Sequence, residues 1–160
     1  RRREPTAAFR SNFIVGYPGE TEEDHDQLLR FVEAAELDWC GFFSYSPEEG
    51  TYAFDLDGAV DPELVHDRLA ELRELQDEIT ARRRDDLIGT TTTALVDEPG
   101  IGRSHREAPE IDGVIEVPDD LAVGEFVEVR IVDAMGPDLV AVPATGPVID
   151  PVAGTSGDEG

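Results

Sequence analysis

The sequence predicts an α/β segment over residues 1–88, followed by a small antiparallel β-barrel over residues 89–143. In the first part, strand-like and helix-like blocks alternate, which indicates a βαβ unit with parallel strands and a right-handed crossover. In the second part, apolar residues tend to alternate with polar ones, and glycine and proline turn signals separate the runs. Residues 144–160 are rich in Gly, Pro, Ser and Asp and predict a disordered tail.

The βαβ unit is predicted from two apolar runs and the helix signals between them. Residues 13–15 form a short apolar strand that ends at the turn signal 16–19. Thr21 lies where an N-cap is expected, and the acidic residues 22–24 favour the helix dipole. A second strand is predicted at 39–43. Apolar residues at helical spacing predict one buried face for the helix: Leu28, Phe31, Val32 and Ala35.

A long helix is predicted from Pro62 to about Asp86, with the arginines of 82–84 near the negative end of its dipole and Gly89 beyond its end. At 1.5 Å per residue it spans roughly 37 Å, which is long enough to join two domains. Its apolar stripe consists of Val65, Leu69, Leu72, Leu75 and Ile79. Four barrel strands are predicted within the ranges 91–96, 114–117, 126–132 and 139–142.

Acidic residues dominate the chain, with 37 against 13 basic residues and a net charge of −24. All basic residues other than histidine are arginines. This charge disfavours general binding to nucleic-acid phosphates and allows electrostatic steering towards a basic partner. The alternative explanation is solubility or adaptation to salt. No apolar run approaches the roughly 20 residues of a membrane span, and residues 1–10 have no apolar core of a secretory signal. We therefore expect a cytoplasmic protein without a membrane partner.

No catalytic group or metal site can be assigned from the residues alone. A single cysteine, Cys40, excludes a disulfide framework and a multi-thiolate metal site within this sequence. It lies in an apolar strand and is expected to be a small buried hydrophobe. The histidines are isolated in sequence, and we expect His25 at the surface.

Two segments could bind a ligand or a partner. The turn 16–21 ends a parallel strand and opens a helix, where α/β folds place ligands; an ordinary βα turn is the alternative. Arg103 and Arg106 are the only arginines between residues 87 and 129. They form either surface ion pairs with Glu107 and Glu110 or part of a binding face on the barrel.

Residues 13–21 resemble the strand and turn of radical S-adenosylmethionine methylthiotransferases, and residues 45–51 resemble their next strand-end loop. The resemblance covers about residues 9–143 in the order of the family. Three further segments resemble the TRAM domain of the RimO branch, which modifies an aspartate of small-subunit ribosomal protein twelve: 97–98, 102–104 and 108–113.

This resemblance implies a partial (β/α) radical-SAM barrel followed by a five-stranded, OB-like TRAM barrel. It also implies a 4Fe-4S cluster that cleaves S-adenosylmethionine, a radical that removes hydrogen from the aspartate β-carbon, and installation of a methylthio group there. By matching positions, the S-adenosylmethionine side would include Gly16, Pro18, Gly19 and Glu20, with Ser44 and Tyr45 at the neighbouring strand end. The substrate-facing barrel residues would be Arg103, Glu110 and Asp112.

The sequence departs from the family in lacking its Cys-x3-Cys-x2-Cys cluster motif. Three thiolates cannot come from one cysteine, so the chain is expected to be a C-terminal part of the enzyme and inactive alone. The alternatives are a fragment of a tRNA methylthiotransferase of the MiaB type and a non-catalytic TRAM binding module. From residue 87 onward, 15 acidic residues against 3 arginines disfavour tRNA and favour a basic ribosomal protein.

Overall fold

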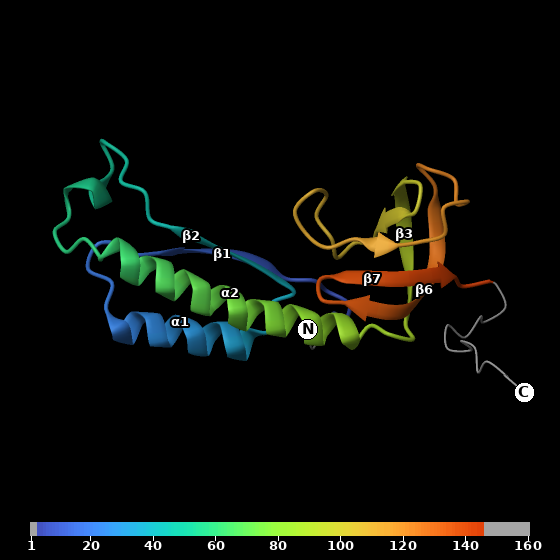
Figure 1. Cartoon of the computed structure of the whole chain (residues 1–160), viewed down its shortest axis with the longest axis horizontal. Helices are drawn as coiled ribbons and strands as arrows, with labels where there is room; N and C mark the ends of the chain where they lie inside the picture. The colour runs from blue at the N-terminus through green and yellow to red at the C-terminus, as the bar shows by residue number, and fades with distance from the viewer. Residues whose placement is uncertain (1–2, 146–160) are drawn as a thin grey trace, which may run out of the picture.

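The computed structural model describes residues 3–145, so all but the first two residues of the predicted tail lie outside the described range. A two-stranded sheet with its helices occupies one end of the elongated molecule, and a barrel occupies the other (Figure 1). The elements of the first part are β1 (Arg10–Val15), α1 (Glu22–Ala35), β2 (Trp39–Ser44), the 3-10 helix η1 (Tyr52–Asp55) and α2 (Pro62–Asp85). The barrel strands are β3 (Thr91–Glu98), β4 (Ile101–Arg103), β5 (Ile115–Glu116), β6 (Phe126–Met135) and β7 (Asp138–Pro143).

The predicted βαβ unit is present. Strands β1 and β2 pair in parallel, in register from Arg10 opposite Trp39 to Val15 opposite Ser44. Helices α1 and α2 cover one face of this sheet (Figure 1). The core between the sheet and the helices is formed by Val15, Val32, Phe42, Leu69, Leu72 and Ile79.

The start of α1 follows the sequence prediction, and of its predicted apolar face Val32 is buried and Leu28 and Ala35 are half-buried, so that only Phe31 and the added His25 differ. The Thr21 hydroxyl accepts a hydrogen bond from the Asp24 amide, and the Asp24 carboxylate accepts one from the Thr21 amide. The prediction of a surface position for His25 was wrong, because His25 is only 5% exposed and its Nε2 lies 2.9 Å from the Glu71 carboxylate of α2. Phe31 is largely exposed instead. The buried stripe of α1 therefore runs through His25 and Val32.

The barrel is closed, with strand order β3-β4-β5-β7-β6. Strand β4 was not predicted, because three residues around Gly102 are too short to show alternation. Strand β5 pairs in parallel with β7, so the expectation of a purely antiparallel barrel was wrong at this one pairing. The barrel core consists of Ala94, Ile115, Val117, Val129, Ile131, Leu139 and Ala141.

A buried ion pair joins the barrel to the α/β part. Arg84, in the last turn of α2, is 4% exposed and contacts the Glu107 carboxylate, itself 1% exposed, at 2.5 Å. The Arg84 Nε also donates to the Pro137 carbonyl at 2.8 Å, and its guanidinium lies 5.1 Å from the centre of the Trp39 ring. The Trp39 indole in turn donates to the Arg106 carbonyl at 2.6 Å. These contacts fix the barrel against both β2 and α2.

The face of the sheet opposite the helices carries exposed apolar side chains. Ile14 and Phe43 lie side by side in register and are 61% and 57% exposed. Among the described residues, neither helix is long and apolar enough to cross a membrane.

Candidate functional site

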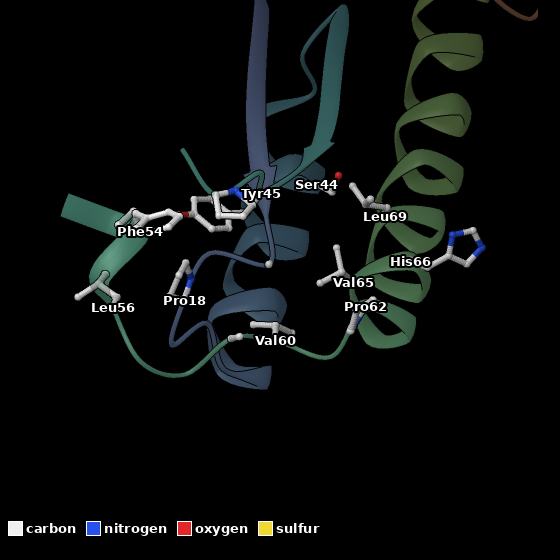
Figure 2. A pocket seen from close by; sticks show the side chains of 14 residues that line it. Pro18, Ser44, Tyr45, Phe54, Leu56, Val60, Pro62, Val65, His66 and Leu69 are labelled. Carbon is white, nitrogen blue, oxygen red and sulfur yellow. The ribbon is translucent and has the colours of Figure 1, made fainter. Parts of the chain in front are cut away.

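A cavity of about 550 Å³ lies between the carboxyl ends of β1 and β2 and the first turns of α2 (Figure 2). Four of the six residues assigned to the S-adenosylmethionine side line it: Gly16, Pro18, Ser44 and Tyr45. Much of the remaining wall is apolar and comes from the loop after β2 and from α2: Phe54, Leu56, Val60, Pro62, Val65 and Leu69. We refer to this cavity as the strand-end pocket.

The backbone conformation and the packing at position 16 both require glycine. The φ of Gly16, 82°, lies in the left-handed region, and a Cβ at this position would lie 2.5 Å from a methyl group of Val65. The glycine therefore lets α2 approach the end of β1. Gly19 also has a positive φ, and its amide donates to the Gly58 carbonyl at 2.7 Å. This bond holds the loop before α2 against the turn.

Glu20 does not line the strand-end pocket but holds the turn in place. One of its carboxylate oxygens accepts from the Gly16 amide at 2.7 Å, and the other accepts from Arg68 at 2.7 Å. Arg68 is buried and also contacts Glu22 at 2.5 Å. The amides of Gly16 and Gly19 are thus already satisfied within the chain, which leaves neither available to an anionic ligand.

Sequence reasoning missed Arg68. Burial lowers its pKa, but the hydrogen bonds and charges of Glu22 and Glu20 outweigh burial and hold the pKa above its usual value. The available signal was its spacing, three residues after Val65 and four before Leu72, which places an arginine on the apolar face of α2. Such a position requires a buried partner.

Tyr45 supplies the spare polar group of the strand-end pocket. Its ring packs edge-on against Tyr17 at 5.5 Å between centroids, and its hydroxyl is buried with no hydrogen-bond partner among the described residues. Phe54 lies close to Tyr45, whereas the His66 ring points away from the pocket (Figure 2). Apolar walls with one unpartnered hydroxyl suit a flat heterocycle with polar edges, such as the adenine of S-adenosylmethionine.

An iron–sulfur cluster does not fit the residues of this chain. Cys40 is the only cysteine, and burial raises the pKa of its thiol to about 11, which disfavours the thiolate that a cluster requires. Among residues 3–145, no group of three or more cysteine, histidine or carboxylate side chains could hold a metal ion.

The three residues assigned to the substrate side of the barrel, Arg103, Glu110 and Asp112, line one groove of about 740 Å³. Asp112 is nevertheless committed to internal contacts, since its carboxylate accepts from the Ala108 amide at 2.8 Å and from Arg10 at 2.5 Å. Glu110 is exposed, with a left-handed φ of 64°.

The arginines of this region have partners other than those expected from the sequence. Arg103 contacts Asp97 at 3.3 Å, and Arg106 lies 3.6 Å from Asp38. Burial lowers the pKa of Arg106, opposed by the charge of Asp38. Glu107, expected at the surface, is the buried partner of Arg84. The Arg106–Asp38 and Arg84–Glu107 contacts bind the barrel to the α/β part.

The chain combines an α/β unit, a long helix and a closed five-stranded barrel. The family model described as "TRAM domain" matches residues 88–143, which include all five barrel strands. The chain is also similar over most of its length to proteins named "Ribosomal protein uS12 methylthiotransferase RimO". The relative from Azoarcus sp. (strain BH72) is 49% identical over 143 residues, which cover 86% of this chain and 32% of that protein.

The relative from Cutibacterium acnes is 46% identical, with 90% of this chain and 31% of that protein covered. The relative from Thermus thermophilus is 48% identical, with 88% of this chain and 34% of that protein covered. Over most of its length the chain is thus similar to a C-terminal part of proteins named RimO. It spans about a third of the length of these relatives.

Proposed function

We propose that this chain is the C-terminal part of an enzyme that adds a methylthio group to the β-carbon of an aspartate in ribosomal protein uS12 by radical S-adenosylmethionine chemistry. The observation that carries the proposal is identity of 46–49% to uS12 methylthiotransferases over 86–90% of the chain. In this proposal, residues 1–88 complete a radical-SAM barrel, residues 89–143 form the TRAM domain, and the enzyme works in the cytoplasm.

The strand-end pocket is the proposed site of S-adenosylmethionine, which supplies the radical precursor when bound. Pro18 and Tyr45 would form apolar walls, and the unpartnered Tyr45 hydroxyl would hydrogen-bond a polar edge of the ligand. Ser44 would line the opposite side. Glu20 and Gly19 would act indirectly, because their bonds to Gly16 and Gly58 shape the turn.

Turnover also requires the 4Fe-4S cluster, whose thiolate ligands this chain does not carry. We therefore expect no methylthio transfer by this chain alone. Its own contribution would be to complete the pocket and to bind the protein substrate.

The TRAM domain is the proposed docking module for uS12, taken as a basic protein. From residue 87 onward the sequence has 15 acidic residues and 3 arginines, a charge that attracts a basic protein and repels RNA. A tRNA substrate and a purely non-catalytic binding module are the competing functions. The charge disfavours the first, and the similarity to methylthiotransferases through the α/β part disfavours the second.

Titration of the full chain with purified uS12 and with tRNA, at low and moderate salt, tests the docking role. We expect binding to uS12 that weakens as salt rises, and no comparable binding to tRNA. Tight tRNA binding without affinity for uS12 would overturn the proposed substrate.

A further inference from the structure

A second groove, of about 910 Å³, runs between β2, α2 and two loops of the barrel. We call it the edge groove, because it follows the edge of β2 that does not pair with β1. Its lining includes Cys40, Phe43, Gln76, Asp77, Glu78 and Ile111. It is separate from the strand-end pocket, with which it shares no lining residue.

The β2 edge in this groove offers backbone hydrogen-bonding groups. The Tyr45 amide donates to Val15 of β1, and the Trp39 amide donates to Phe9, the residue before β1. Because alternate residues of a parallel strand direct their backbone groups to the same neighbour, the odd-numbered residues of β2 face β1. Cys40 and Phe42 therefore direct their backbone groups to the other edge. Arg73 of α2 donates to the Phe42 carbonyl at 3.3 Å, but no strand of the described range pairs there. An extended segment could pair with such an edge.

A buried acceptor without a partner lines the same groove. Gln76 is 4% exposed, and its Nε2 donates to the Leu37 carbonyl and the Thr80 hydroxyl, each at 3.0 Å. Because the Leu37 carbonyl can only accept, the orientation of the amide is fixed. Its Oε1 has no hydrogen-bond partner among the described residues. An incoming N–H donor would satisfy this oxygen.

The charge of the edge groove is negative. Asp77 and Glu78 are exposed on α2 and form no ion pair within residues 3–145. The only arginine in the lining, Arg10, is already bound to Asp112. Phe43 and Ile111 add exposed apolar surface. This combination suits an extended segment with cationic and apolar side chains and disfavours a nucleic-acid strand.

We infer that the edge groove docks an extended cationic segment of the protein substrate as an added strand on β2. Its backbone pairs with Cys40, which lines the groove, and with the Phe42 amide on the same edge of β2, while the Phe42 carbonyl stays bound to Arg73. Its arginine or lysine side chains contact Asp77 and Glu78, and a donor reaches Gln76. This inference rests on the proposed function for the identity of the substrate. The groove chemistry itself can be tested with a model peptide.

The probe is a fluorescent peptide of about nine residues with alternating arginine and valine, which matches the length of a strand. Its matched control has the same side chains with alternate backbone amides methylated, so that it keeps its charge but loses strand pairing. The peptides are titrated against the full chain, against Asp77→Lys/Glu78→Lys and against Asp26→Lys/Glu33→Lys. The last variant makes the same charge change at exposed positions of α1, outside both the groove and the barrel.

We expect the unmethylated peptide to bind and to slow amide exchange in β2. Backbone methylation and Asp77→Lys/Glu78→Lys should each weaken binding about tenfold, with little change for Asp26→Lys/Glu33→Lys. The inference is overturned if the peptide does not bind, or if methylation and the groove variant leave its affinity unchanged.

A parallel titration with uS12 separates this inference from the proposed function. If uS12 binds and the groove variant binds it equally well, docking occurs elsewhere and only the inference fails. If the peptide behaves as expected but uS12 does not bind, the groove stands as a site for cationic peptides and the proposed docking role fails.

Discussion

Replacing Glu107 by glutamine should be strongly destabilising, because it leaves Arg84 as an uncompensated buried charge. Both side chains are almost fully buried at the junction between the barrel and α2, at 4% and 1% exposure. Glutamine preserves the volume of the side chain but removes its charge. The Ser104 amide and hydroxyl, which donate to the other carboxylate oxygen at 2.7 Å, would also lose a charged acceptor.

Breaking a buried pair by removing one partner typically costs about 3–5 kcal/mol of unfolding free energy. The Pro137 carbonyl bond and the contact with Trp39 remain in Glu107→Gln and compensate only part of the lost interaction. In Arg84→Met/Glu107→Leu neither charge is present. We therefore expect this double variant to be less destabilised than the sum of Arg84→Met and Glu107→Leu.

Urea unfolding can be followed by the fluorescence of Trp39, the only tryptophan, which lies at the junction. It measures the stability lost in Glu107→Gln and the departure from additivity in the double variant. With a denaturant dependence of about 2 kcal/mol per molar, Glu107→Gln should lower the midpoint by about 2 M. Glu110→Gln, a change of the same chemistry at an exposed site, should alter the unfolding free energy by at most about 0.5 kcal/mol. Equal stability of Glu107→Gln and Glu110→Gln, or full additivity of the Arg84 and Glu107 single variants, would refute the reasoning.

Gly16→Ala should cost about 1–3 kcal/mol of stability, because it strains a left-handed residue against Val65, and Val65→Ala should recover part of that loss in urea unfolding. An unchanged unfolding free energy for Gly16→Ala would show that the close approach of Val65 does not require glycine at this position. Thr21→Ala should cost about 1 kcal/mol through loss of the α1 cap, whereas Thr21→Ser should cost little; equal losses would contradict the cap. Alkylation of Cys40 at pH 8 should be about a hundredfold slower than that of a cysteine with an unshifted pKa, and should accelerate up to about pH 11. A rate plateau near pH 9 would contradict the raised pKa.

The parts of the fold that depend on local sequence were predictable. The strand and turn before α1, the Thr21 cap and the extent of α2 each follow from signals within a few neighbouring residues. The four residues at the ends of β1 and β2 also meet in one pocket, because parallel strands bring their carboxyl ends together.

The rest depends on contacts between residues far apart in sequence. Glu107 looked like a surface residue because nothing near it in sequence indicates that Arg84 lies against it. The same holds for Arg68, whose partners Glu20 and Glu22 come from the turn and from α1. Strand β4 carries too few residues for any periodicity, and only closure of the barrel requires it.

A chimaera tests the central claim, that this chain is the functional C-terminal part of a uS12 methylthiotransferase. The aligned third of the Thermus thermophilus relative would be replaced by this chain, the cluster reconstituted, and methylthiolation of uS12 followed by mass spectrometry. We expect methylthiolated uS12 from the chimaera and none from this chain alone. A folded, cluster-loaded chimaera that cleaves S-adenosylmethionine but neither binds nor modifies uS12 would contradict the claim.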